Sequence, residues 1–201
     1  MTLTKEKFRQ TCLEKLRALP STNRLYLDSL VNAKLFELLK SCRNKSILFY
    51  YPLSSEVDLR KIMNIVRKRN NVYLPFMEHQ SFKMVRFRLP LQKKKFGIYE
   101  AGNSLRNFKT VDIVIVPTVG IDGNMQRVGF GKGMYDRFFA SLQKKPYTIF
   151  VQAKRCFTKQ KICDSYDVSC DELVTPQTKK RDNNRKNYVK RNTNRRLYSH
   201  D

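Results

Sequence analysis

Glycine is concentrated in one short part of this chain. Of the seven glycines among its 201 residues, five lie between Gly120 and Gly133. The preceding run, Val111–Val116, is nearly all apolar and β-branched, which is typical of a strand buried on both faces. A helical pattern follows over Gly131–Leu142. A strand, a glycine-rich loop and a helix in this order indicate an α/β fold in which the loop lies beyond the carboxyl end of a strand.

The rest of the chain also alternates between helical and strand patterns. Apolar residues recur at helical spacing in the first part, and short apolar runs follow. The predicted helices are Thr4–Leu19, Thr22–Ser41 (with Ser21 or Thr22 as N-cap) and Val57–Arg69, and the predicted strands are Ser46–Tyr51, Asn71–Pro75, Lys83–Leu89 and Tyr147–Val151. This order predicts a single three-layer α/β domain, Rossmann-like, with a mostly parallel sheet and helices on both faces.

Positive charge is in large excess. The chain has 41 Lys and Arg against 17 Asp and Glu, a formal net charge of +24. Residues 179–201 alone hold nine basic and two acidic residues and few large apolar groups. They can bury too little to offset the entropy of ordering. We therefore expect a folded domain over residues 1–176 and a basic, mobile tail over residues 177–201. The charge favours anionic partners, such as phosphates or nucleic acid.

Cysteine and histidine content limits other classes. The five cysteines include no Cys-x-x-Cys pair, and His79 and His200 lie far apart. We therefore expect no zinc site, no disulfide framework and no serine–histidine chemistry, but reduced thiols in the cytoplasm. No apolar run is long enough to span a bilayer, and the amino terminus lacks a signal-peptide pattern. The expectation is a cytoplasmic monomer without a membrane partner.

Basic residues in and near the glycine loop are candidates for phosphate binding. Arg127 and Lys132 lie within the loop, where glycines let backbone N–H groups approach an anion closely. At about 100° per residue, Lys5 points into the apolar stripe of the first helix and Arg9 lies at its edge. The alternatives are an ordinary surface loop and long side chains that reach water past apolar neighbours. The loop matches neither Gly-x-Gly-x-x-Gly nor a Walker A sequence.

Carboxylates are scarce, so few residues could bind a metal. Asp136 lies in the first turns of the helix after the loop, where Mg²⁺ that bridges phosphates would lie. Asp122 lies in the loop itself, and a further acidic cluster includes Asp164 and Asp167. Glu56 follows the strand Ser46–Tyr51. The alternatives are acids that favour a helix N-terminus for Asp136 and Glu56, and a solvated turn for the cluster.

These segments, in this order, resemble the 5-formyltetrahydrofolate cyclo-ligases, also called 5,10-methenyltetrahydrofolate synthetases. The most specific match is Arg127–Arg137 (RVGFGKGMYDR), which is similar to the family's Arg-Leu-Gly-x-Gly-x-Gly-Tyr-Tyr-Asp-Arg signature. Supporting matches are Lys5-x-x-x-Arg9, Tyr51-Pro52-x-x-x-Glu56-Val57-Asp58, Phe96-Gly97-Ile98-x-Glu100, and Asp167 with Asp171–Thr175. The resemblance covers Lys5–Pro176 and departs from the family pattern at Ala101, Met134 and Tyr166.

The resemblance implies an ATP- and Mg²⁺-dependent enzyme of folate one-carbon metabolism. Such an enzyme closes the ring of 5-formyltetrahydrofolate to give 5,10-methenyltetrahydrofolate, ADP and phosphate, after phosphoryl transfer to the formyl oxygen. Two hypotheses compete with it. One is a nucleic-acid-binding protein that uses the basic surface and tail. The other is a sugar-phosphate isomerase-like enzyme, for which no general base is evident.

The resemblance also implies roles for individual residues. ATP would be bound by Lys5, Arg9, Arg127, Gly129, Gly131, Lys132, Gly133, Tyr135 and Asp136. Mg²⁺ would be bound by Asp136 and Asp167. The folate would be bound by Tyr51, Glu56, Phe130, Met134 and Tyr135, and the reacting groups would be contacted by Arg127, Lys132 and Tyr135.

Overall fold

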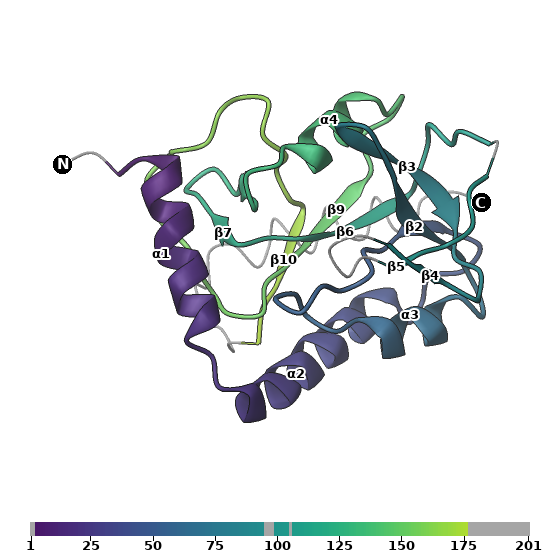
Figure 1. The fold of residues 1–201 in the computed structure, drawn as a ribbon, viewed down its shortest axis with the longest axis horizontal. Helices are drawn as coiled ribbons and strands as arrows, with labels where there is room; N and C mark the ends of the chain where they lie inside the picture. The colour runs from purple at the N-terminus through teal and green to yellow at the C-terminus, as the bar shows by residue number, and fades with distance from the viewer. Residues whose placement is uncertain (1–2, 95–98, 105, 177–201) are drawn as a thin grey trace.

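A six-stranded sheet lies at the centre of the fold (Figure 1). Its strand order is β10-β9-β6-β1-β2-β3. All neighbouring strands are parallel except β2 and β3, which form an antiparallel hairpin. The computed structural model describes residues 3–94, 99–104 and 106–176. The strands are β1 Ser46–Leu48, β2 Asn71–Glu78, β3 Ser81–Arg86, β6 Ile113–Pro117, β9 Tyr147–Val151 and β10 Glu172–Val174. The predicted, mostly parallel sheet is confirmed.

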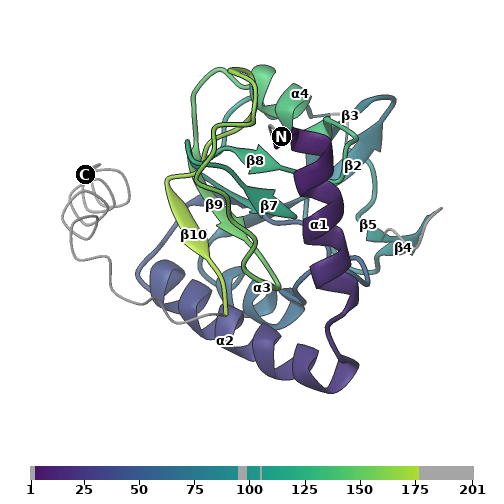
Figure 2. The ribbon, with the colours of Figure 1, turned by 90° about the vertical axis from the view of Figure 1, so that its left-hand side faces the viewer.

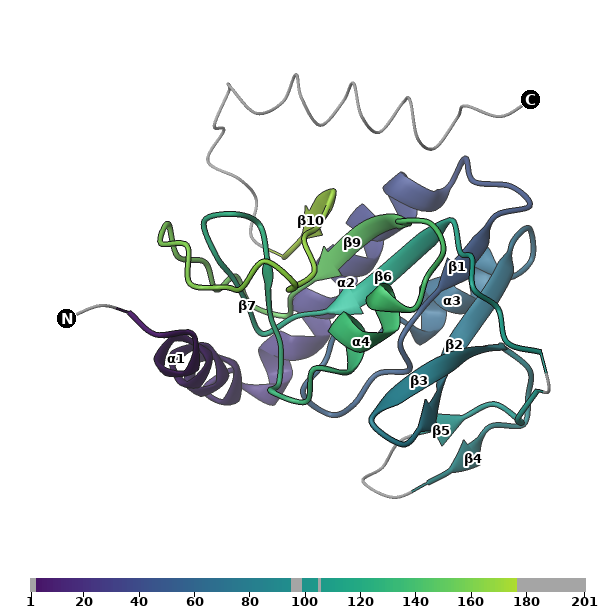
Figure 3. The same cartoon turned by 90° about the horizontal axis from the view of Figure 1, so that it is seen from above.

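Helices cover both faces of this sheet. The helices are α1 Lys5–Arg17, α2 Ser21–Leu39, α3 Arg60–Val66 and α4 Met134–Ala140. Figure 3 shows α2 and α3 on one face and α4 on the other. In β6, Ile113 and Ile115 join the apolar core on the α2 and α3 side, whereas Val114 and Val116 join the core on the α4 side. This burial on two sides explains the unbroken apolar run, and the predicted three-layer arrangement is confirmed.

Helix α1 lies at the edge of the domain and packs against the short strand β7, Gly120–Ile121 (Figure 2). A Cβ at position 120 would lie 2.6 Å from the ring of Phe8 and 2.9 Å from the sulfur of Cys12, so only glycine allows this close approach. Cys12 also forms a disulfide with Cys156, which follows β9. The expectation that all thiols are reduced is therefore wrong. The two cysteines are 144 residues apart in sequence, and their spacing gives no sign of the pairing.

The glycine-rich segment contains more regular structure than its sequence predicts. Strand β7 pairs with β8, Arg127–Val128, in an antiparallel hairpin. Helix α4 begins at Met134 rather than Gly131, because Gly131 and Gly133 have φ angles of 92° and 61°, which lie outside the helical range. These glycines therefore form an irregular loop between β8 and α4.

Smaller differences occur elsewhere. Helix α2 begins at Ser21 after Pro20, which makes no side-chain cap bond, so the predicted N-cap is wrong. Helix α3 begins at Arg60 rather than Val57. A two-stranded sheet pairs β4 Gln92–Lys93 with β5 Tyr99–Glu100.

None of the helices in the described part of the chain is long and apolar enough to cross a membrane. The predicted tail, residues 177–201, lies outside the described residues.

Candidate functional site

The carboxyl ends of β1 and β6 lie side by side, because these strands are neighbours in the sheet. The chain leaves β1 toward α3, and it leaves β6 toward α4 by way of the β7–β8 hairpin. Helices α3 and α4 lie on different faces of the sheet (Figure 3). In open α/β sheets, ligands bind in the crevice at such a divergence. Here the crevice brings Glu56, which follows β1, to Pro117 at the end of β6, and both residues line the same two cavities.

Arg127 is a buried cation in this crevice. It is 7% exposed, and its Nη1 lies 3.7 Å from Oδ2 of Asp136. Its Nε donates a hydrogen bond of 3.3 Å to the carbonyl of Pro117. The guanidinium carbon lies 4.9 Å from the ring centroid of Tyr135. Burial lowers the pKa of Arg127, and the charge of Asp136 opposes this change. A buried cation with one long ion pair favours an additional anionic partner.

The loop Gly129–Gly133 joins Arg127 to α4. A Cβ at position 129 would lie 2.3 Å from Nη2 of Arg127, so the loop backbone passes directly beside the guanidinium. Arg9 reaches the same loop from α1, and its Nε donates a hydrogen bond of 2.9 Å to the carbonyl of Gly129. Lys132 is exposed. The structure therefore brings Arg9 and Arg127 together at the loop and leaves Lys132 on its outer surface.

Acidic residues lie next to these cations. Lys5 of α1 forms an ion pair with Asp167, and its Nζ lies 3.4 Å from Asp164. Burial lowers the pKa of Lys5, but the hydrogen bond and charge of Asp167 outweigh this effect and the pKa is raised. The backbone N–H of Val168 donates to Oδ1 of Asp136 at 3.4 Å. The two predicted metal ligands, Asp136 and Asp167, are thus linked through adjacent residues.

Asp136 and Asp167 both carry carboxylate oxygens, the kind of ligand that Mg²⁺ takes in proteins. Among the described residues, no group of three or more His, Cys, Asp or Glu side chains could hold a metal. Mg²⁺ in phosphate-binding sites commonly takes only one or two carboxylates and completes its shell with phosphate oxygens and water. Asp136 and Asp167 supply oxygen ligands of that kind, so these residues fit an ion that arrives with a phosphate ligand.

An apolar groove extends from Tyr135 and encloses about 610 Å³ of space that is open to solvent. Four of the predicted folate-binding residues, Tyr51, Glu56, Met134 and Tyr135, line it together. The complete lining is Tyr50, Tyr51, Leu53, Glu56, Pro75, Met77, Phe82, Tyr99, Pro117, Met134 and Tyr135. Aromatic walls with one acidic group suit a flat ring ligand with N–H donors at its edge.

Glu56 is the acidic group of this groove. Its Oε2 accepts a hydrogen bond of 2.9 Å from the backbone N–H of Leu53, and its carbonyl accepts one of 2.8 Å from Arg24. Burial raises the pKa of Glu56 to about 7, although the Leu53 hydrogen bond and the charges of Arg127 and Arg24 act in the other direction. The carboxyl group therefore changes charge near neutral pH, as functional carboxyls often do.

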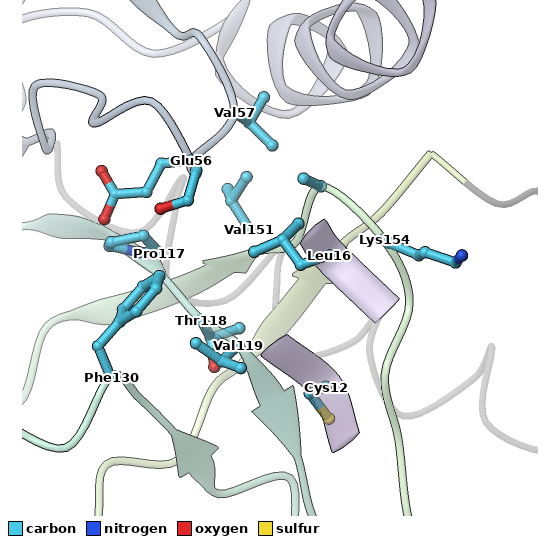
Figure 4. Close-up of a pocket in the computed structure, with 12 residues that line it drawn as sticks. Cys12, Leu16, Glu56, Val57, Pro117, Thr118, Val119, Phe130, Val151 and Lys154 are labelled. Carbon is cyan, nitrogen blue, oxygen red and sulfur yellow. The ribbon is translucent and has the colours of Figure 1, made fainter. Parts of the chain in front are cut away.

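A smaller cavity lies between Glu56 and helix α1. Figure 4 shows Glu56, Pro117 and Phe130 on one side of it and Cys12 and Leu16 of α1 on another. Phe130 lines this cavity and not the larger groove. The structure therefore separates Phe130 from the predicted folate-binding residues Tyr51, Met134 and Tyr135. Glu56 borders both cavities.

Sequence reasoning missed several groove residues. Tyr50 is 3% exposed, and its hydroxyl donates to the carbonyl of Val57 at 3.0 Å; in the apolar run around it, it looks like an ordinary core residue. Tyr99 lies with its ring centroid 5.4 Å from that of Tyr51, a contact that no local pattern predicts. The matched segment Phe96-Gly97-Ile98 lies outside the described residues.

Comparison with known proteins assigns the family. The model of the 5-formyltetrahydrofolate cyclo-ligase family matches residues 1–176. The chain belongs to this family. The cyclo-ligase of Mus musculus is 25% identical over 187 residues, which cover 85% of this chain and 92% of the mouse protein. The cyclo-ligase of Mycoplasma pneumoniae is 26% identical over 182 residues, which cover 87% of this chain and 100% of that protein.

A solved structure supports the same assignment. The 5,10-methenyltetrahydrofolate synthetase of Aquifex aeolicus is 27% identical, with a TM-score of 0.73, and the match covers 88% of this chain and 91% of that chain. The cyclo-ligase resemblance and the assignment to the ligases are therefore confirmed. The isomerase-like hypothesis is not supported. The roles of individual residues stay predictions.

Proposed function

We propose that the chain converts 5-formyltetrahydrofolate and ATP into 5,10-methenyltetrahydrofolate, ADP and phosphate, with Mg²⁺ bound beside the phosphates. The observation that carries this proposal is the position of Arg127. It pairs with Asp136 beside the glycine loop and lies over the ring of Tyr135, which lines the groove. One buried cation is thus in contact with both candidate binding regions, and group transfer between two bound molecules needs such proximity.

The phosphates of ATP would lie against the loop Gly129–Gly133. Arg127 and Arg9 already contact this loop, and Lys5 lies nearby through its pair with Asp167. Cations that are held by carboxylates in the free protein can exchange these partners for phosphate oxygens. Asp136 and Asp167 would hold Mg²⁺, which neutralises charge on the phosphoryl group when it is bound.

The folate ring would lie in the aromatic groove. The Glu56 carboxylate would accept hydrogen bonds from N–H groups at the edge of the ring, and Tyr51 and Tyr135 would contact its faces. The formyl group would then point toward Tyr135 and Arg127. The buried guanidinium would then stabilise charge on the phosphoryl group during transfer, because a charge in a dry site acts strongly.

The proposed reaction has two steps. The formyl oxygen attacks the γ-phosphorus of ATP, the bond from that phosphorus to the β,γ-bridging oxygen breaks, and ADP leaves. N10 of the folate then attacks the activated formyl carbon and loses its proton, and the carbon–oxygen bond breaks to release phosphate. The protein contributes orientation and charge stabilisation, which is the main requirement of phosphoryl transfer.

The test mixes the full-length protein with 5-formyltetrahydrofolate, ATP and Mg²⁺ and follows the absorbance of the methenyl product. We expect product only in the complete mixture. Absence of product with both substrates present, or an equal rate without ATP, would contradict the proposal.

A pair of variants on α1 tests the phosphate position. Lys5→Met should raise the KM for ATP, because Lys5 reaches the candidate metal ligand Asp167. Lys7→Met is the matched control, since Lys7 is an exposed lysine of the same helix turn. Equal KM values for both variants would place the phosphates elsewhere.

A further inference from the structure

Asp122 is a buried carboxylate that the proposed reaction does not use. It is 0% exposed. Its Oδ1 accepts hydrogen bonds from the backbone N–H groups of Asn124 and Gln126 at 2.9 and 3.0 Å. Its Oδ2 accepts hydrogen bonds from the backbone N–H groups of Ile162 and Cys163, both at 3.1 Å. Four backbone N–H groups thus satisfy both oxygens of the buried side chain in place of water, so Asp122 holds backbone segments together and is not free to bind a metal.

These four donors belong to two segments that are distant in sequence. One is the turn of the β7–β8 hairpin, and the other is the loop that follows Cys156. Further backbone contacts hold the segments together. The N–H of Gly123 donates to the carbonyl of Gln160 at 3.0 Å, and the N–H of Arg127 donates to the carbonyl of Val168 at 2.8 Å. A Cβ at position 123 would lie 2.2 Å from the carbonyl oxygen of Lys159, so the two backbones are in direct contact.

Gln126 adds a side-chain link at the same place. It is 9% exposed, and its Nε2 donates to the carbonyls of Asp164 and Asp167 at 2.6 and 3.1 Å. The N–H of Asp164 in turn donates to Oδ2 of Asp167 at 2.7 Å. The hairpin therefore holds the second segment in place, and this segment carries the Asp167 carboxylate that pairs with Lys5.

The two segments carry the two halves of the candidate phosphate site. The hairpin contains Arg127 and leads into the glycine loop, and the second segment carries Asp167. We propose that Asp122 is a positioning residue that sets the distance between Arg127 and Asp167, and thereby the affinity for ATP with its Mg²⁺. This inference rests on the proposed function. The same arrangement explains why position 122 holds a carboxylate. An asparagine amide has only one oxygen, so its NH₂ group would face one of the two pairs of backbone N–H donors and could not accept their hydrogen bonds.

The test compares Asp122→Asn with Asp112→Asn. Asp112 also links two segments, since its carboxylate accepts hydrogen bonds from the N–H and hydroxyl of Ser46 at 2.7 and 2.5 Å. It precedes β6 and so lies at the other end of that strand from the hairpin. For each full-length variant, calorimetry would measure the binding of ATP with and without Mg²⁺ and of 5-formyltetrahydrofolate. Urea unfolding would measure stability.

We expect Asp122→Asn to weaken MgATP binding roughly 10- to 100-fold, as is usual for residues that orient metal ligands. Addition of Mg²⁺ should increase the ATP affinity of this variant less than it increases the ATP affinity of the wild type. The affinity for 5-formyltetrahydrofolate should be nearly unchanged. Asp112→Asn should lose stability without a selective loss of MgATP binding. If both variants lose stability and bind MgATP like the wild type, Asp122 has only a structural role and the inference is wrong.

A second variant covers the case in which Asp122→Asn does not fold. Gln126→Met keeps Asp122 and removes the two hydrogen bonds to the Asp164 and Asp167 carbonyls. It should show the same selective loss of MgATP binding, and wild-type affinity in a folded Gln126→Met protein would overturn the inference. Failure of the wild type to bind ATP at all would instead contradict the proposed function.

Discussion

The guanidinium carbon of Arg127 lies over the ring of Tyr135, 4.9 Å from its centroid, and Nη1 of Arg127 lies 3.7 Å from Oδ2 of Asp136. Tyr135 faces the aromatic groove, and Asp136 lies one residue further along α4. The beginning of this helix therefore connects the groove, the buried cation and a candidate metal ligand within two consecutive residues.

Arg127→Ala should lower kcat/KM for ATP roughly 100-fold or more, because it removes a preorganised charge from a buried site. The dissociation constant of 5-formyltetrahydrofolate should change far less. Calorimetry on the folded variant measures each affinity separately. Arg127→Lys, which retains a charge but not the planar fork, should be intermediate. Equal losses for both ligands would place Arg127 outside the phosphate site.

Glu56 should make folate use dependent on pH. Its pKa is raised to about 7, mainly by burial, so the group is neutral below this pH and a carboxylate above it. If the carboxylate accepts hydrogen bonds from the folate, kcat/KM for folate should fall as pH decreases from 8 to 6. Steady-state rates across this range measure the effect, since kcat/KM reports groups of the free enzyme.

Glu56→Gln is the matched variant for this pH dependence. It should lower kcat/KM for folate at pH 8 by roughly 10- to 100-fold, the usual cost of a lost hydrogen bond to a charged group. It should also remove the decrease between pH 8 and 6. Glu78→Gln changes an exposed carboxylate that pairs with Lys83, and this variant should retain that decrease. Persistence of the decrease in Glu56→Gln would assign it to another group.

The Cys12–Cys156 disulfide should stabilise the domain. It closes a loop with a sequence separation of 144 residues, and bridges of this kind contribute roughly 2 to 5 kcal/mol to the free energy of unfolding. A dithiol reductant should therefore lower the urea midpoint of the wild type. The Cys12→Ser/Cys156→Ser double variant should already have the lower midpoint and should not respond to the reductant. A wild-type midpoint that is insensitive to reductant would contradict this pairing.

Deletion of residues 177–201 should leave kcat and both KM values nearly unchanged. The contacts of the candidate site lie between Lys5 and Val168, and the family match ends at residue 176. Steady-state kinetics of the truncated and full-length chains measure this. If the tail binds nucleic acid, RNA should bind the full-length chain more tightly than the truncated chain, whatever the effect on turnover. A large loss of turnover in a folded truncated protein would show that the tail contributes to catalysis.

The sequence predicted those features that depend on local periodicity. Strand β9 has the predicted bounds Tyr147–Val151. A short run of apolar and β-branched residues between polar segments is typical of a buried strand. The helical spacing predicted that Lys5 and Arg9 face the body, and both contact it. Family resemblance then supplied the ligase assignment, which spacing alone did not reach.

Features that depend on distant contacts were not predictable in this way. The β7–β8 hairpin has strands of two residues, too short for a periodic signal. Tyr50 and Tyr99 line the same groove only because two segments that are distant in sequence meet in space. Asp122 is a polar residue in a polar turn, and only the folded chain shows that a second loop covers it. The cytoplasmic location and the monomeric state stay predictions.

The fate of the formyl oxygen distinguishes the proposed phosphoryl transfer from other routes to the methenyl product. 5-Formyltetrahydrofolate labelled with ¹⁸O at the formyl oxygen would be converted with ATP and Mg²⁺, and the released phosphate analysed by mass spectrometry. We expect the label to appear in inorganic phosphate, because the proposed reaction phosphorylates the formyl oxygen before N10 closes the ring. Label found in water, with unlabelled phosphate, would show that the ring closes without phosphorylation of the formyl oxygen and would contradict the account.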